Sequence, residues 1–150
     1  MMGLRKKFFR NPDFLNKPAV KLMQEQHKRA FGTAINNNGY PDMGNGRYSE
    51  QLEYSEWVEF NNAQRAHHNM IEVSGTVLTT LVLNGLFQPV VSAGLGFGFA
   101  FGRILYSLGY NSKSGADGRT AGAVVASIAT YGLYLLSFYN GLKLAGIVKF

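Results

Sequence analysis

The sequence AGAVVASIATYGLYLLSFYNGL, residues 121–142, contains no charged side chain. Its length falls within the roughly 17–25 residues that a helix needs to cross the hydrocarbon core of a bilayer. Two further apolar stretches precede it, at about residues 70–87 and 90–108, and each is also long enough to span. The sequence therefore predicts an integral membrane protein of the all-α class, with three transmembrane helices.

The connectors between these stretches predict their arrangement. Gln88-Pro89 is too short for anything but a tight turn, so the first two spans should form an antiparallel hairpin. Residues 111–120 are polar and rich in Gly and Ser, which is typical of a loop between the second and third spans. Within the second span, Gly94, Gly98 and Gly102 recur every four residues. This spacing of small residues favours close helix packing in membranes.

The charged residues are concentrated in the first half of the chain. We expect a polar N-terminal arm over residues 1–68 and a three-helix transmembrane domain over residues 69–150. The arm holds ten of the fifteen Lys and Arg residues and seven of the nine Asp and Glu residues. Its sequence predicts four segments, namely a basic tail (1–13), a short helix (19–31), a Gly- and Asn-rich loop (32–46) and an amphipathic helix from Ser49.

Composition excludes several classes of function. The absence of cysteine rules out a disulfide framework, a Cys-based metal site and a Cys nucleophile. The net charge of +6 could suggest nucleic acid, but the basic residues alternate with acids and no nucleic-acid motif is present. Anionic headgroups of a lipid bilayer suit this charge better. His67 and His68 point to different helix faces and His27 is isolated in sequence, so no metal site is expected.

Polar side chains inside the apolar spans are candidate site residues. A charged side chain at bilayer depth costs about 2.5–3.5 kcal/mol on insertion scales, so it usually faces a partner in the bundle interior. Two sets of three polar residues each share one helix face, namely Arg65, Asn69 and Glu72 on the first helix, and Arg103, Tyr106 and Tyr110 on the second. Because the two helices are antiparallel, both sets lie at the same membrane level.

Two interpretations of these polar sets remain open from spacing alone. The first is a structural ion pair between Arg103 and Glu72, with tyrosines at the membrane interface. The second is a binding site for an anionic ligand, since guanidinium groups bind carboxylates and phenols add further hydrogen bonds.

The polar sets also belong to longer motifs. Residues 65–72, RAHHNMIE, look like the R-A-x-x-N-x-x-E motif of the glutathione-using MAPEG superfamily, and residues 103–110, RILYSLGY, look like its R-x-x-Y-x-x-x-Y motif. The chain most resembles the type-3 microsomal glutathione S-transferase branch. The resemblance is good over residues 64–150 and patchy over residues 26–41.

This resemblance implies a trimer of four-helix protomers, with glutathione as co-substrate in a cleft between neighbours. It implies that the residues holding glutathione are Arg29, Arg65, Asn69, Glu72, Arg103, Tyr106 and Tyr110. It further implies that Arg119 stabilises the glutathione thiolate, because a nearby cation lowers a thiol pKa. The nucleophile then belongs to glutathione, which agrees with the absence of cysteine.

The chain departs from the family pattern at its beginning. The apolar part of the first transmembrane helix is missing, and polar residues 1–25 stand in its place.

The expected function is a glutathione-dependent transferase or peroxidase acting on lipophilic electrophiles or lipid hydroperoxides, in the endoplasmic reticulum or the mitochondrial inner membrane. The alternative is a non-catalytic accessory subunit of a large organellar membrane complex, such as a mitochondrial respiratory complex, in which other subunits fill the groove left by the missing helix.

Overall fold

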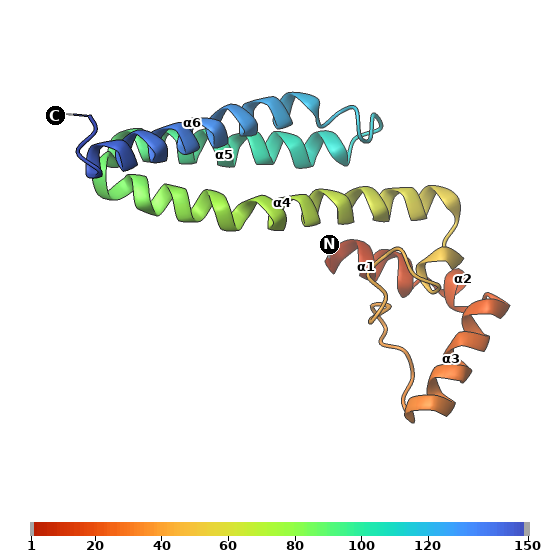
Figure 1. Ribbon diagram of the computed structural model, residues 1–150. Helices are drawn as coiled ribbons and strands as arrows, with labels where there is room; N and C mark the ends of the chain where they lie inside the picture. The colour runs from red at the N-terminus through yellow and green to blue at the C-terminus, as the bar shows by residue number, and fades with distance from the viewer. Residues whose placement is uncertain (1, 149–150) are drawn as a thin grey trace. The chain divides into compact units, whose positions relative to one another are not determined.

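The computed structural model describes residues 2–148, which form helices and loops and no strand. The helices are α1 (Met2–Phe9), α2 (Pro12–Leu15), α3 (Pro18–Phe31), the short 3-10 helix η1 (Ser49–Gln51), α4 (Tyr54–Phe87), α5 (Pro89–Tyr110) and α6 (Thr120–Leu144) (Figure 1). The chain divides into two compact units, Met1–Arg65 and Ala66–Phe150, and the division falls within α4.

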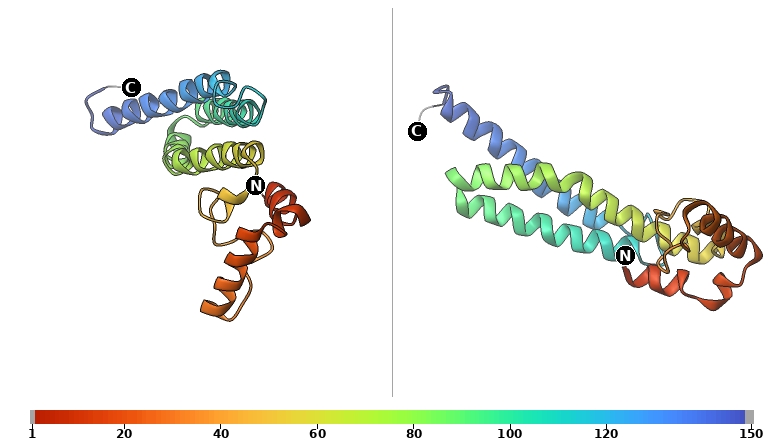
Figure 2. Two further views of the ribbon diagram at one scale, coloured as in Figure 1. Left: turned by 90° about the vertical axis from the view of Figure 1, so that its right-hand side faces the viewer. Right: turned by 90° about the horizontal axis from the view of Figure 1, so that it is seen from below.

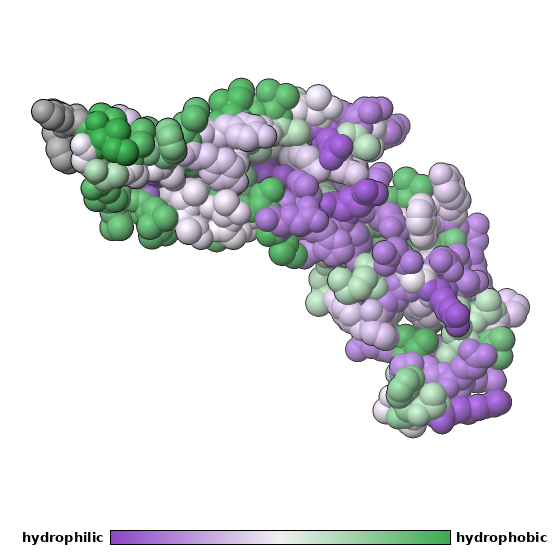
Figure 3. All heavy atoms as spheres, viewed as in Figure 1, coloured by the Kyte–Doolittle hydropathy of each residue, from purple (hydrophilic) through white to green (hydrophobic). Residues whose placement is uncertain are grey.

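The predicted all-α class and the three spans are confirmed. Helices α4, α5 and α6 are each long and apolar enough to cross a membrane. α4 ends at Phe87 and α5 begins at Pro89, so the predicted tight turn joins them. In the second unit α5 and α6 pack against each other, and α4 runs along the same bundle, with α6 crossing it at an angle in the view from below (Figures 1 and 2). Its surface is mostly apolar towards the α4–α5 turn, and polar residues gather around the loop between α5 and α6 (Figure 3).

The helix predicted from Ser49 and the first span form one element rather than two. α4 runs without interruption for 34 residues from Tyr54. The sequence between Tyr54 and Ser74 contains neither Gly nor Pro, so nothing in it breaks the backbone hydrogen-bond ladder where the polar segment meets the apolar one.

Helices α5 and α6 approach most closely where glycine faces backbone. A Cβ atom added to Gly122 would lie 2.0 Å from the backbone nitrogen of Tyr106, and one added to Gly102 would lie 2.4 Å from that of Ala126. A Cβ on Gly98 would make only ordinary contact, and Gly94 has no neighbour within 4 Å. A four-residue spacing drifts around a helix by about 40° per step, so the predicted glycine row cannot stay on one contact line.

A buried polar network joins the helices near the α4–α5 turn. The Asn84 side-chain amide donates to the Leu133 carbonyl at 2.9 Å and to the Ser137 hydroxyl at 3.0 Å. Asn140 donates to Asn84 at 3.1 Å and accepts from Gln88 at 3.1 Å. Each amide in this apolar region therefore has a partner, as a water-free environment requires. The sequence analysis did not single out this network.

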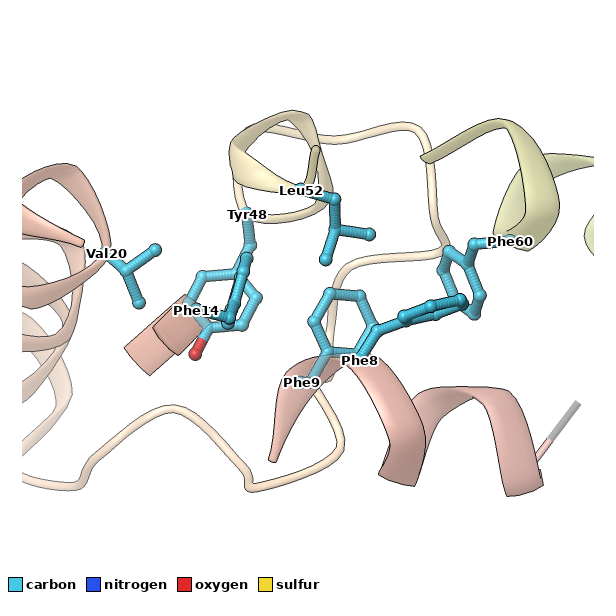
Figure 4. Close-up of a cluster of buried hydrophobic side chains, with 7 residues drawn as sticks. All are labelled: Phe8, Phe9, Phe14, Val20, Tyr48, Leu52 and Phe60. Atoms are coloured by element: carbon cyan, nitrogen blue, oxygen red, sulfur yellow. The ribbon is translucent and has the colours of Figure 1, made fainter. Parts of the chain in front are cut away.

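The first unit has an aromatic core that includes part of the predicted basic tail. Residues predicted as a tail form α1 and the beginning of α2 instead. The buried core consists of Phe8, Phe9, Phe14, Val20, Tyr48, Leu52 and Phe60 (Figure 4). The segment was predicted as a tail because it is rich in basic residues such as Lys6 and Lys7. The Phe8-Phe9 pair that follows them packs against residues distant in sequence. The prediction of a tail was wrong for that reason.

Hydrogen bonds hold the loop between α3 and η1 in place. Arg5 is only 3% exposed, and its guanidinium donates to the carbonyls of Asn38 at 2.9 Å and Asp42 at 2.7 Å. The Asp42 carboxylate in turn accepts from the backbone N–H groups of Gly44, Gly46, Tyr48 and Ser49, at 2.7 to 3.1 Å. Burial by itself would raise the pKa of Asp42, but hydrogen bonds from Ser49, Gly44 and Gly46 outweigh it and lower the pKa below its ordinary value of 3.8.

Asp42→Asn is expected to destabilise the first unit by about 1–3 kcal/mol at neutral pH, because the amide offers one acceptor oxygen to several donors. A folded-state pKa below the unfolded one means that the carboxylate stabilises the fold above pH 3.8 and loses this effect as the pH falls through the folded pKa. The difference in stability between wild type and variant should therefore narrow as the pH falls below 3.8. Denaturant unfolding in detergent, followed by fluorescence of Trp57, the single tryptophan, measures this because Trp57 packs against the core.

The matched control is Glu50→Gln, a carboxylate in the same unit that is exposed. It should leave the unfolding midpoint unchanged. A stability difference for Asp42→Asn that stays constant with pH would contradict the lowered pKa.

Candidate functional site

A cleft of about 360 Å³ opens in the second unit and is lined by α4, α5 and α6. Its polar lining includes Asn69 of α4, Arg103 and Tyr106 of α5, and Arg119, which directly precedes α6. Four residues predicted from sequence to act in a site therefore line one cleft.

Arg103 contacts both neighbouring polar residues in the cleft. Its Nη1 donates to Asn69 Oδ1 at 2.8 Å, and its guanidinium carbon lies 4.3 Å from the centroid of the Tyr106 ring. Its Nε is buried and has no hydrogen-bond partner among residues 2–148. A buried donor without a partner is costly, so this atom marks a position where an acceptor from a ligand would be stabilised.

The ion pair between Arg103 and Glu72, one of the two interpretations that spacing left open, does not form. Glu72 is exposed, and its Oε2 accepts a long hydrogen bond of 3.5 Å from Asn69 Nδ2 on its own helix. The hydrogen-bond partner of Arg103 on α4 is therefore Asn69 and not Glu72.

Arg119 reaches the same tyrosine from the loop side. Its Nη1 donates to the Tyr106 hydroxyl at 3.0 Å, and its Nε donates to the Ala116 carbonyl at 3.2 Å. Its guanidinium carbon lies 5.5 Å from the centroid of the Tyr110 ring. The hydrogen bond to Tyr106 raises the pKa of Arg119 further above its ordinary value, so this exposed side chain is a permanent cation at the cleft.

Small residues leave room for the two tyrosines. Tyr106 and Tyr110 are buried and cluster with Ala66 of α4. On the α6 side, Gly122 lets the backbone of α5 approach at Tyr106. Larger side chains at these two positions would displace the ring that both arginines contact.

The other predicted site residues lie elsewhere. Glu72 and Tyr110 are not among the residues lining the cleft. Arg65 is exposed on α4, at the end of the first unit. Arg29 is exposed on α3 in the first unit, where its Nη2 lies 3.7 Å from Glu25 Oε2.

The part of the cleft contributed by α6 was not predicted from the sequence. Ser127, Thr130, Tyr131 and Tyr134 line it. Their spacing of i, i+3, i+4 and i+7 places them on one helix face, and this polar pattern within a charge-free span was the available signal.

The comparison with known families agrees with the motifs around this cleft. The model of the MAPEG family matches residues 20–139. The chain belongs to the MAPEG family. The match includes all of α4 and α5 and most of α6, and so every residue of the cleft. No solved structure matches the chain.

Membership confirms the predicted superfamily and fits a membrane protein related to glutathione transferases. The MAPEG match begins at Val20, which lies in α3, a helix that is not among the three candidate spans.

Proposed function

We propose that the protein is a glutathione-dependent transferase or peroxidase, closest to the type-3 microsomal branch, that acts on lipophilic electrophiles or lipid hydroperoxides within the bilayer. The unpartnered Nε of Arg103 carries this proposal. An arginine has five N–H donors, and in the described structure Arg103 uses one of them, on Asn69. The remaining donors suit a carboxylate, and glutathione has two.

The cationic end of the cleft supports this assignment. Arg103 and Arg119 both contact Tyr106, so two guanidinium groups and a phenol are available to one anionic ligand. In the proposed complex Asn69, Arg103 and Tyr106 hold the tripeptide from one protomer. The exposed residues Arg29, Arg65 and Glu72 complete the site in a homotrimer. The buried Tyr110 supports it through its ring contact with Tyr106, at a centroid distance of 5.7 Å.

Arg119 is proposed to stabilise the glutathione thiolate. A cation close to a thiol favours its charged form and lowers its pKa by about 1–3 units. This chain has no cysteine, so the thiol that reacts is that of glutathione. Attack of this thiolate on an electrophilic carbon forms a C–S bond and expels a leaving group such as a halide. Attack on a hydroperoxide breaks the O–O bond and gives an alcohol and glutathione sulfenic acid, which a second glutathione converts to the disulfide with release of water. Neither step needs a nucleophile from the protein.

Arg119→Ala is expected to lower the rate of glutathione conjugation to an aryl halide by about tenfold or more, because the thiol pKa rises and the thiolate fraction at neutral pH falls. The ultraviolet thiolate band of bound glutathione should weaken in parallel. Arg119→Lys should restore part of the rate, because it retains the charge. Lys113→Ala removes a cation from the same loop and should have no effect. A wild-type rate for Arg119→Ala would contradict the assigned role.

A second candidate is a non-catalytic accessory subunit of a larger membrane complex. It is favoured by the first unit, which has an aromatic core of its own in addition to the three candidate spans and offers a surface for other subunits. The native mass of the protein in mild detergent, with glutathione titrated into the sample, separates the two candidates. A homotrimer that binds glutathione supports the enzyme, whereas a much larger assembly without a glutathione response supports the subunit. Fractionation of endoplasmic reticulum and mitochondrial membranes tests the expected location.

A further inference from the structure

The α6 wall of the cleft carries hydroxyl groups beyond the two arginines. Tyr131 and Tyr134 both line the cleft, and their rings meet edge to face with centroids 6.2 Å apart. They lie eight and eleven residues after Ala123, the cleft residue nearest to Arg119 in sequence. At 1.5 Å per residue, this places them about 12–16 Å further along α6.

These two tyrosines lie near the middle of a transmembrane helix. α6 runs from Thr120 to Leu144, so Tyr131 and Tyr134 are about 17–21 Å from its first residue. This depth is close to the centre of a hydrocarbon core of about 30 Å, where no water is available to satisfy a polar group.

Among residues 2–148, the hydroxyl groups of Tyr131 and Tyr134 have no hydrogen-bond partner. The Thr130 hydroxyl donates to the Ala126 carbonyl at 2.8 Å on its own helix. Within residues 2–148, by contrast, Tyr131 and Tyr134 make ring contacts but no hydrogen bond. A tyrosine hydroxyl removed from water usually has a hydrogen-bond partner. A bound molecule that carries a polar group would therefore be stabilised next to these two hydroxyls.

We propose that Tyr131 and Tyr134 are specificity-determining residues that hydrogen-bond an oxygen carried in the middle of a lipid acyl chain. This rests on the proposed function, in which glutathione occupies the end of the cleft at Arg103 and Arg119. The end lined by Tyr131 and Tyr134 then receives the lipid. A hydroxyl or hydroperoxyl group offers a donor and an acceptor to the two phenols, whereas a plain hydrocarbon chain leaves both unpaired.

Native mass spectrometry of the full chain, without glutathione, tests this inference separately from the proposed function. The protein is incubated with equal amounts of two phosphatidylcholines, one carrying a 12-hydroxystearoyl chain and one a stearoyl chain. Because their headgroups are identical, the ratio of bound lipids reports on the chain alone. Wild type should retain the hydroxylated lipid about fivefold over the plain one, the effect of one net hydrogen bond.

The double variant Tyr131→Phe/Tyr134→Phe should bring this ratio to about one while still binding the plain lipid, which shows that the cleft is intact. Tyr139→Phe is the matched control, because Tyr139 lies on the same helix but does not line the cleft. It should keep the wild-type ratio. A ratio of one in wild type, or an unchanged ratio in the double variant, would overturn the assignment whether or not the protein uses glutathione.

Discussion

Arg103→Leu is expected to weaken glutathione binding by about 10- to 150-fold, the loss of one charge-assisted hydrogen bond of about 1.5–3 kcal/mol. The reason is geometric as well as electrostatic. Arg103 is fixed by its bond to Asn69 and by its position over Tyr106, while its buried Nε remains without a partner. Equilibrium dialysis of radiolabelled glutathione against the detergent-solubilised protein measures the change.

One further variant at this position and one control outside the cleft separate charge from shape. Arg103→Lys keeps the charge but loses the planar fork and the stacking on Tyr106, so it should recover only part of the affinity. Lys113→Ala, which removes an exposed cation, should bind as wild type does. Because leucine also removes the hydrogen bond to Asn69, a monodisperse size-exclusion peak for Arg103→Leu is the check that lost binding does not come from unfolding. Binding at wild-type affinity would refute the proposed glutathione site.

Gly122→Ala should destabilise the second unit by about 1–3 kcal/mol or more, the typical cost of an oversized side chain at a tight contact. The added Cβ would lie 2.0 Å from the backbone nitrogen of Tyr106 and 2.5 Å from its Cα. Backbone atoms cannot rotate out of the way, so α5 and α6 must separate. Thermal unfolding in detergent, followed by loss of the monodisperse size-exclusion peak, measures the effect. Glutathione binding should fall with it, because Tyr106 moves.

The control for this variant is Gly141→Ala on the same helix. Gly141 has no atom of the described chain within 4 Å of the added Cβ. Alanine has a higher helix propensity than glycine by about 0.8–1 kcal/mol, so this variant should be neutral or slightly stabilised. The two substitutions are chemically identical, but their effects on stability should have opposite signs. Equal melting temperatures would mean that α5 and α6 pack less closely than described.

The sequence by itself determined the fold class, the three spans and the α4–α5 turn. These depend on local properties, namely the length of apolar runs, the position of Pro89 and the spacing of polar residues along a helix. Local spacing also placed Asn69 and Arg103 at the same membrane level, because a two-helix hairpin leaves little freedom along its axis. The motifs built on these residues identified the family, which the match over residues 20–139 confirms.

Only the tertiary structure decided which polar groups meet. From the sequence, an ion pair between Arg103 and Glu72 remained possible. The rotation of α4 about its axis instead places Asn69 within hydrogen-bond distance of Arg103. The contact of Arg119 with Tyr106 depends on how the loop before α6 folds, and the tight contact at Gly122 depends on the crossing of α5 and α6. Rotation and crossing are set by packing between segments distant in sequence, so no local pattern encodes them.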